Sequence, residues 1–332
     1  MKNVITKGLV MAHAIENING KDCMFYVGET PWHGLGQKLN DAPTIGEAID
    51  AAGLDWEVGL KDLQTVDGVP VSHRATYRKT DGNILGVVGP RYAPLQNREA
   101  FDWFQPFLDA GECNLHTAGS LHSGQKVWVL AKLNRDNSEI VKGDETAKFI
   151  LLSNSHDGTT AIRVGYSFIR VVCANTLAAA HSKTSGNKLI RIRHTRSSKT
   201  NLENIRDIMD NINSEFEATA EQYRFLASKN FNQVDVRKYV KTVLGIEKVD
   251  DNDIKTRTRN IMDEILTLID GPKQSAAGVR GTYWAAWMGY NEYLNYRKGR
   301  TADNRLDSLW FGQSANDDMY AFNKAMEFAS AV

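Results

Sequence analysis

The stretch VGLKDLQTVDGVPVSHRATYRKTDGNILGVV, residues 58–88, decides how the first half of this chain folds. Apolar and polar residues alternate through it with the period of two that is typical of β-strands. Asp67-Gly68 and Asp81-Gly82 interrupt the alternation, and an Asp-Gly pair is a strong signal for a tight turn between strands. The stretch therefore predicts a meander of three antiparallel strands over residues 58–66, 69–78 and 84–88.

The middle strand of this meander has two chemically different faces. One face carries Val69, Val71, Ala75 and Tyr77, and the other carries Ser72, Arg74, Thr76 and Arg78. Because side chains alternate across a strand, we expect the apolar face to pack in the core and the basic face to lie in solvent.

The sequence on either side of the meander adds helices and more strands. Thr44-Ile45-Gly46-Glu47 has the form of a capping box and predicts a short helix through Ala51. Asn97 begins a second helix, which Pro106 should kink or shorten. Further strands are expected over residues 125–133, 148–153, 160–172 and 188–195, with a helical turn over 173–181.

From Leu202 onward, apolar residues recur at helical spacing. Helices are predicted over residues 202–226, 234–244, 282–296 and 316–329, with another that starts at Asp251 or Asn252 and ends at 271–272. The fold class is therefore α+β: an N-terminal antiparallel β-meander with helices, followed by a mostly helical C-terminal region. The polar joint at 196–201 predicts two domains, an α+β domain over 1–200 with a basic strand face and a helical domain over 201–332.

Composition limits the class of protein. The 332 residues include 40 basic and 40 acidic side chains, and 42% are hydrophobic, as in ordinary globular proteins. No apolar run has the length of a membrane span, so we expect no membrane contact. The three cysteines are far apart and odd in number, which favours a reducing compartment, the cytoplasm, over a disulfide framework.

The charges, although balanced overall, are segregated. Between Asp157 and Glu203 the chain has no acidic residue and eight basic ones: Arg163, Arg170, Lys183, Lys188, Arg191, Arg193, Arg196 and Lys199. A local positive field on a neutral protein suits a polyanion, and guanidinium groups bind phosphate with two hydrogen bonds. The alternative is that these arginines pair with carboxylates of the helices after Asn201 and hold the two halves together.

The nucleic-acid interpretation assigns roles to individual residues. Arg163, Arg170, Lys188, Arg191, Arg193 and Arg196 would hold phosphates, and Arg74, Arg78 and Lys126 would extend the groove. A second basic group, Arg74, Arg78, Lys79 and Arg91 with Tyr77 and Tyr92, has the composition of a base-stacking surface, although a solvated strand face explains it better.

No enzyme signature is present. The eight histidines lack the spacing of a zinc or iron site, and neither a nucleophile elbow nor a phosphate-binding P-loop occurs. We therefore expect no catalytic residue, no metal and no cofactor, and we expect His116, His122 and His156 to be surface or capping residues. The aromatic residues of 283–296 are expected to pack in the core, with a protomer interface as the second choice.

Several motifs resemble one known family. Pro31-Trp32-His33-Gly34-Leu35-Gly36 and Arg170-Val171-Val172-Cys173-Ala174-Asn175-Thr176 are its most specific runs, and 92–97, 284–293 and 309–312 also match it. These motifs resemble the phage/plasmid-like proteins built on a domain of unknown function, number nine-three-two. The resemblance starts at Met11, which makes Met11 an alternative start to Met1, and it implies a phage or plasmid setting but no activity.

A weaker resemblance is topological. Residues 54–108 are similar in outline to the β-meander and helix of phage single-strand annealing proteins, which form rings or filaments around a basic groove. We therefore expect a non-enzymatic homo-oligomer that binds single-stranded DNA, or RNA, and anneals strands in recombination or replication. Two alternatives stay open: a metal-dependent nuclease using His156 and Asp157, and a host-interaction or assembly protein whose basic face binds an acidic protein partner.

Overall fold

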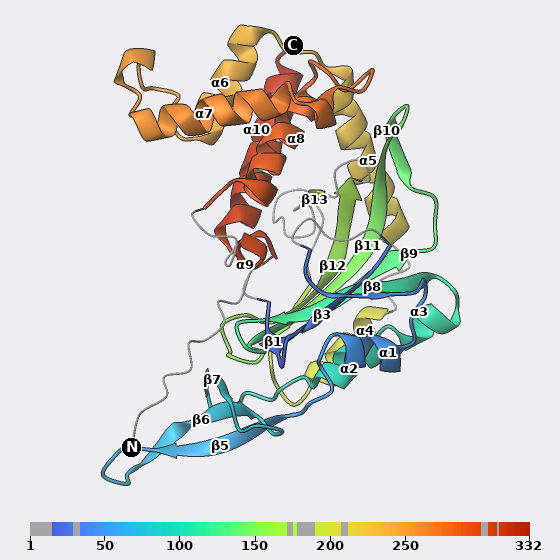
Figure 1. Ribbon diagram of the computed structural model, residues 1–332, viewed down its shortest axis with the longest axis vertical. Helices are drawn as coiled ribbons and strands as arrows, with labels where there is room; N and C mark the ends of the chain where they lie inside the picture. The colour runs from blue at the N-terminus through green and yellow to red at the C-terminus, as the bar shows by residue number, and fades with distance from the viewer. Residues whose placement is uncertain are drawn as a thin grey trace.

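A large, mostly antiparallel sheet lies at the centre of the N-terminal half (Figure 1). The computed structural model describes residues 15–28, 34–170, 175–177, 190–206, 212–299, 305–310 and 312–332. Within these residues the strand order is β13-β12-β11-β9-β8-β3-β4, with β10 beside β11 and β14 beside β12. The pairing of β3 with β4 is parallel. The strands are β3 (Met24–Val27), β4 (Gln37–Leu39), β8 (Cys113–Leu121), β9 (Lys126–Leu133), β10 (Ser138–Val141), β11 (Asp144–Ser155), β12 (Ile162–Arg170), β13 (Asn175–Leu177) and β14 (Ile190–Ile192), and a two-stranded ribbon, β1 (Asn17–Ile18) and β2 (Lys21–Asp22), precedes them.

The predicted meander is a separate three-stranded sheet, β5 (Val58–Gln64), β6 (Pro70–Arg78) and β7 (Ile84–Val88), which extends from the lower end of the molecule in Figure 1. Both pairings are antiparallel, which confirms the prediction from the Asp-Gly turns. Gly68 and Gly82 take left-handed backbone angles, with φ of 85° and 76°. A residue with a side chain rarely adopts these angles, so glycine is the natural choice for both turns.

The faces of this small sheet differ from the prediction, although Ala75 of the predicted inward face is buried. Thr76 and Arg78 are buried, whereas Val71, Ile84 and Val87 are exposed. The polar face packs against the large sheet: the Thr76 hydroxyl donates a hydrogen bond of 2.7 Å to the carbonyl oxygen of His156. A Cβ on Gly86 would lie 2.5 Å from the Cα of Asp157, so the two backbones approach closely. The hydrogen bond from Thr76 and the close backbone approach at Gly86 therefore favour turning this face inward, together with the buried Val88.

Short helices cover part of the large sheet: α1 (Ile45–Ala51), α2 (Asn97–Asp102) and α3 (Gln105–Asp109). The capping box of α1 is present, because the Thr44 side chain accepts a hydrogen bond from the Glu47 amide while the Glu47 carboxylate accepts one from the Thr44 amide. Pro106 lies in the first turn of α3, so the predicted interruption after Asn97 is a break into two helices. Proline fits there because the first amides of a helix have no intrahelical partner.

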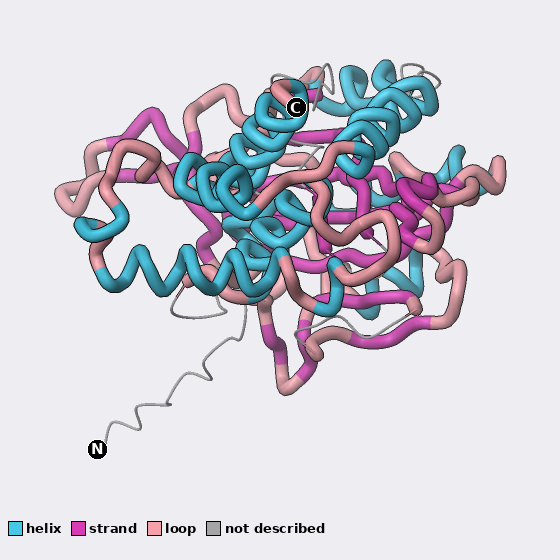
Figure 2. The backbone as a smooth tube through the Cα atoms, turned by 90° about the horizontal axis from the view of Figure 1, so that it is seen from above, coloured by secondary structure: helices cyan, strands magenta, loops and turns pink. Residues whose placement is uncertain are grey.

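The C-terminal region is mostly helical, as predicted, and Figure 2 shows its helices gathered together when the molecule is seen from above. Two elements differ from the expectation: α9 was not foreseen, and residues 251–253 form a short 3-10 turn before α7. Residues 175–177, expected in a helical turn, form a strand. The elements are α4 (Ser198–Arg206), α5 (Ile212–Ser228), α6 (Gln233–Val243), η4 (Asp251–Asp253), α7 (Thr256–Ile269), η5 (Pro272–Gln274), α8 (Tyr283–Tyr296), α9 (Arg305–Trp310) and α10 (Gln313–Ser330).

Helix α8 is the centre of this helical region. Every residue from Tyr283 to Asn295 is buried, which confirms the core interpretation of its aromatic side chains. The indole of Trp284 donates to Asp144 at the start of β11, and that of Trp287 donates to Asp318 in α10. Each fully buried aromatic side chain stabilises the fold by about 2–3 kcal/mol. Helix α8 therefore ties the helices to one another and to the end of the large sheet.

The strands of the large sheet are buried on both faces. In β9, Val127, Val129 and Ala131 belong to the main hydrophobic cluster, which also contains α8, while Trp128 and Leu130 belong to a smaller cluster on the other face. The main cluster contains residues from both sides of position 200, and the proposed division into two domains stays a prediction.

Two simpler expectations concern a membrane span and cysteine chemistry. Among the described residues, no helix has both the length and the apolar character needed to cross a membrane. Cys23 and Cys113 are buried free thiols, and burial raises the pKa of each to about 12. Cys173 lies outside the described residues.

Candidate nucleic-acid interface

Two segments that are far apart in sequence meet beside the small sheet. One is the loop 89–95 that follows β7, and the other is 193–196, which joins β14 to α4. The Ala93 amide donates to the His194 carbonyl oxygen at 3.1 Å, and the Tyr92 ring stacks on the His194 ring with centroids 4.6 Å apart. The Tyr92 hydroxyl donates to the Ser155 carbonyl oxygen at 2.9 Å. These contacts fix the two segments against each other and against the end of β11.

Arg74 holds the loop from the other side. Its guanidinium, which extends from the middle strand β6, donates to the carbonyl oxygens of Pro90 and Tyr92, each at 2.9 Å. The side chain is half-buried, so the predicted groove residue has a structural role as well.

Two adjoining hollows lie on this junction, and we call them the arginine hollows. The first, of about 450 Å³, is lined by Leu60, Arg74, Pro90, Arg91, Tyr92, Ala93, Pro94, Thr195 and Arg196. The second, of about 540 Å³, is lined by Gly89, Pro90, Arg91, Tyr92, Gly158, Thr159, Thr160, Ala161, Arg193, His194 and Thr195. Four arginines thus come together from three chain segments, and the described residues of the two linings include no carboxylate.

The exposed arginines of this junction form no ion pairs with other described residues. Arg91, Arg193 and Arg196 are exposed, and none of them has a carboxylate within ion-pair distance among the residues that the structure describes. The nearby Lys199 does pair with Glu99, at 3.4 Å, on the surface. Among the described residues, these arginines therefore do not pair with carboxylates of the helices after Asn201.

Arg163 and Arg191 form a second basic feature in the adjacent sheet. They are direct cross-strand partners in the pairing of β12 with β14, next to the buried pair Ile162 and Ile192. Burial, together with the charge of Arg191, lowers the pKa of Arg163. Like charges opposite each other destabilise a sheet, so an anion near this pair would be favourable.

Arg78, one of the residues predicted to bind phosphate, lies outside the described linings of both arginine hollows. Its side chain is buried and pairs with the Glu16 carboxylate at 2.5 Å. It also donates to the Ser123 carbonyl oxygen and lies over the Trp56 ring. Strand alternation correctly placed Arg78 on the same face of β6 as Thr76. That face packs against the large sheet instead of lying in solvent.

The other predicted residues lie elsewhere. Lys126 is the first residue of β9 and lies opposite Ser155, outside both hollow linings. Arg170 is at the far end of β12 from Arg163, about 23 Å away at the usual rise of a strand, and its side chain lies outside the described residues. Lys188 lies outside the described residues altogether. Those of the nine predicted residues whose side chains the structure describes therefore do not gather on one surface.

The two residues named for a nuclease are held inside the fold. His156 is fully buried, its Nε2 is 2.9 Å from Asn97 Oδ1, and burial together with His194 lowers its pKa to about 3. Asp157 accepts hydrogen bonds from Ser155 and from the amide and hydroxyl of Thr159, so it closes a turn. Within the described ranges, no group of three metal-ligating side chains occurs. The expectation that His156 is a surface residue was wrong.

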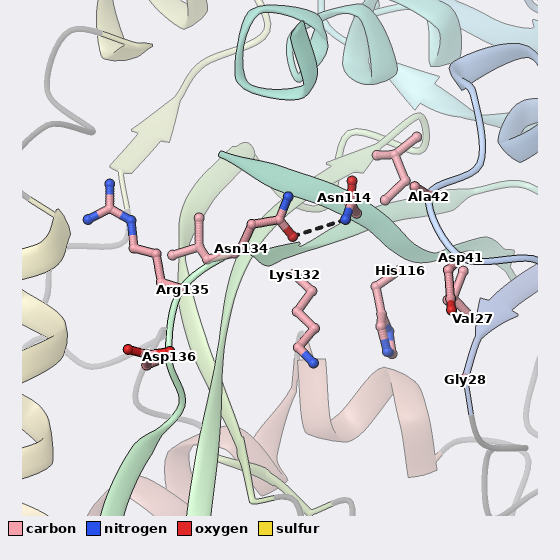
Figure 3. Close-up of a pocket in the computed structure, with 12 residues that line it drawn as sticks. Val27, Gly28, Asp41, Ala42, Asn114, His116, Lys132, Asn134, Arg135 and Asp136 are labelled. Atoms are coloured by element: carbon pink, nitrogen blue, oxygen red, sulfur yellow. Dashed lines mark hydrogen bonds between the residues drawn. The ribbon is translucent and has the colours of Figure 1, made fainter. Parts of the chain in front are cut away.

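A further cavity, of about 620 Å³, lies at the opposite end of β9 (Figure 3). Lys132 of β9 and His116 of β8 extend from neighbouring strands in the same direction, as Figure 3 shows. The lining consists of Val27, Gly28, Asp41, Ala42, Asn114, Leu115, His116, Lys132, Leu133, Asn134, Arg135 and Asp136. Sequence reasoning did not find this cavity, because it depends on which strands are neighbours.

The comparison with known proteins gives a family but no activity. No curated protein and no solved structure matches this chain. The sequence pattern of the family described as Domain of unknown function (DUF932) matches residues 84–310, which is more than half of the chain. The matched region contains the segments of the arginine hollows at 89–94, 158–161 and 193–196, most of the large sheet and the helices α2 to α9, whereas Leu60 and Arg74 lie before it. The protein therefore belongs to the DUF932 family.

Proposed function

We propose that this protein binds single-stranded nucleic acid, and that the arginine hollows hold its phosphates. The observation that carries the proposal is the meeting of Arg74, Arg91, Arg193 and Arg196 in two adjoining hollows whose described linings have no carboxylate. Guanidinium groups match phosphate oxygens with paired hydrogen bonds. A neutral protein that concentrates its positive charge in this way attracts a polyanion to one place.

The arginines, rather than aromatic stacking, supply most of the binding energy in this proposal. Tyr92 is the aromatic side chain of both hollows, but one face of its ring is covered by His194 and its hydroxyl is bound to Ser155. It therefore shapes the ridge between the hollows and offers little surface to a base. Binding should accordingly depend strongly on salt and weakly on base sequence.

The proposal extends to the biological setting. The family resemblance suggests a phage or plasmid protein, acting in the cytoplasm of the host cell on single-stranded DNA or RNA. Strand annealing by a homo-oligomer during recombination or replication would fit a binder that needs no nucleotide hydrolysis. A ring or filament of subunits would connect successive pairs of hollows into a longer track for the strand.

Fluorescence anisotropy with labelled single-stranded DNA, single-stranded RNA and duplex DNA tests the proposal. Affinity for the single strands should fall linearly with the logarithm of salt concentration, by about 0.7 log units for each phosphate bound per tenfold increase in salt. Absent binding, or binding that ignores salt, overturns it. Light scattering during the titration measures the oligomer, and mixing complementary strands measures annealing.

Two other outcomes separate the alternatives. Cleavage of the oligonucleotide with Mg²⁺ or Mn²⁺, abolished by Asp157→Ala, would establish a nuclease and replace the annealing proposal. Saturable binding to an acidic protein that survives nuclease treatment, without any binding to oligonucleotides, would assign the basic surface to a protein partner.

A further inference from the structure

The cavity at the end of β9 has its own polar chemistry. Alternation along β8 places Asn114 and His116 on the face opposite the buried Cys113 and Leu115, and Lys132 lies directly across from Asn114. The register shifts between Leu115 and Thr117, so a bulge lies at His116. Bulges redirect side chains next to functional sites, and here the cationic side chain and the imidazole share one side of the sheet.

Two groups in this cavity have no partner in the described part of the chain. Lys132 has no ion pair there, although Asp41 and Asp136 also line the cavity. The Nδ1 atom of His116 is buried without a hydrogen bond. Its ring packs edge-on against Phe149, with centroids 5.0 Å apart, which fixes its position. A buried ring nitrogen without a hydrogen bond costs about 1–3 kcal/mol, so the fold holds this imidazole in place at some expense.

The lowered pKa of His116 also indicates that an anion would be favourable in this cavity. Burial, followed by the charge of Lys132, lowers the pKa of His116 to about 4, so the imidazole is neutral at pH 7. A neutral imidazole has one nitrogen that accepts a hydrogen bond. An anion between Lys132 and His116 would raise the pKa of His116, because it would offset the charge of the ammonium and favour the imidazolium.

We propose that this cavity binds a small molecule that carries a phosphate monoester. A phosphate oxygen accepts hydrogen bonds from the Lys132 ammonium, and a protonated phosphate oxygen donates to the His116 imidazole. The amide pair Asn114 and Asn134, joined at 2.9 Å, forms one wall. The carboxylates of Asp41 and Asp136 select an organic part that has hydroxyl or amino donors. The volume of about 620 Å³ is that of an ordinary small-molecule site.

This site is separate from the arginine hollows. Lys132 lies six residues along β9 from Lys126, about 20 Å at the rise of a strand, whereas the second hollow adjoins the other end of the sheet. The proposal therefore stands whether or not the protein binds nucleic acid.

The test is a titration with adenosine 5′-monophosphate, followed through the imidazole resonances of the full-length protein. The His116 resonance is assigned by its loss in His116→Gln. We expect a saturable shift of this resonance and a rise in the pKa of His116 by about one unit or more, and we expect adenosine without phosphate to produce neither. Equal shifts with adenosine, or no saturable shift, overturn the proposal, and both are measured on the wild-type protein once the resonance is assigned.

A matched pair of variants checks the role of the lysine. Lys132→Gln should weaken binding of adenosine 5′-monophosphate about tenfold or more, because a charge-assisted hydrogen bond is lost. Lys142→Gln, at an exposed turn residue outside the cavity, makes the same change in net charge and should bind as the wild type does. Equal loss in both variants would mean a general charge effect and would refute the site. Oligonucleotide affinity should be the same in Lys132→Gln and wild type.

Discussion

Replacing Arg193 and Arg196 together with glutamine is the sharpest perturbation of the arginine hollows. Both side chains are exposed and neither forms an ion pair within the described residues, so the change should leave the fold intact. If each arginine neutralises one phosphate, the slope of log affinity against log salt falls by about 0.7 for each, or about 1.4 for both. At about 0.1 M salt, one decade below a 1 M reference, that difference corresponds to roughly 25-fold weaker binding.

The assay is anisotropy of a labelled single-stranded oligonucleotide across a range of salt. The two affinity lines should converge near about 1 M salt, where counterion release no longer favours binding. The control, Lys142→Gln with Lys248→Gln, removes the same charge from two exposed lysines outside both hollows. Parallel lines for Arg193→Gln/Arg196→Gln and wild type, or an equal loss in the control, would refute phosphate binding in the hollows.

Three other perturbations address the fold that supports the site. Glu16→Gln leaves the buried Arg78 guanidinium with only the more distant Asp81 carboxylate, at 3.6 Å, and should lower the free energy of unfolding by about 3 kcal/mol, measured by urea denaturation. Burial holds the pKa of His194 at about 4, below the ordinary value of 6.5, so the unfolded chain takes up the proton first as pH falls. The stability from the neutral imidazole is complete above pH 6.5 and is lost towards pH 4, by roughly 2 kcal/mol at about pH 5, and His194→Gln should flatten this dependence. Gly289→Ala should destabilise α8 by about 1–3 kcal/mol, seen as a lower melting temperature, because its Cβ would lie 2.7 Å from the backbone of Ile269.

Each of these has a matched control. An Arg78→Met change added to Glu16→Gln should recover much of the lost stability, and no recovery would contradict the buried-charge argument. His73→Gln, at an exposed histidine of β6, should leave the pH dependence of stability unchanged, so the same flattening there would exclude His194 as its cause. Gly46→Ala, where nothing lies within 4 Å of the added Cβ, should stabilise helix α1 by a few tenths of a kcal/mol, and destabilisation there would count against the steric reasoning.

Local patterns predicted the elements of this fold well. Two Asp-Gly turns, the capping box at Thr44 and the proline at 106 all act through their immediate neighbours, and each produces the expected turn, cap or break. The aromatic spacing of 283–296 likewise predicted a core helix, because a helix with bulky side chains on every face has to be buried.

Tertiary contacts decided what the local patterns left open. The alternation of β6 separated its two faces correctly, but the choice of the inward face depends on Thr76 and Gly86 meeting the turn at Asp157. The acid-free run contains Arg193 and Arg196, which form no ion pair among the described residues, yet the meeting of Arg91 with Arg193 joins segments about a hundred residues apart. The position of His116 beside Lys132 depends on a bulge that no sequence signal marks.

The outward apolar face of the small sheet has a consequence for mutational tolerance. In a saturation scan scored by cellular abundance, lysine or serine should be accepted at Val71, Ile84 and Val87, although these positions look like core positions in the printed sequence. The polar Thr76 and the side-chain-free Gly86 should tolerate almost nothing. A substitution matrix trained on ordinary strands would rank these positions in the opposite order.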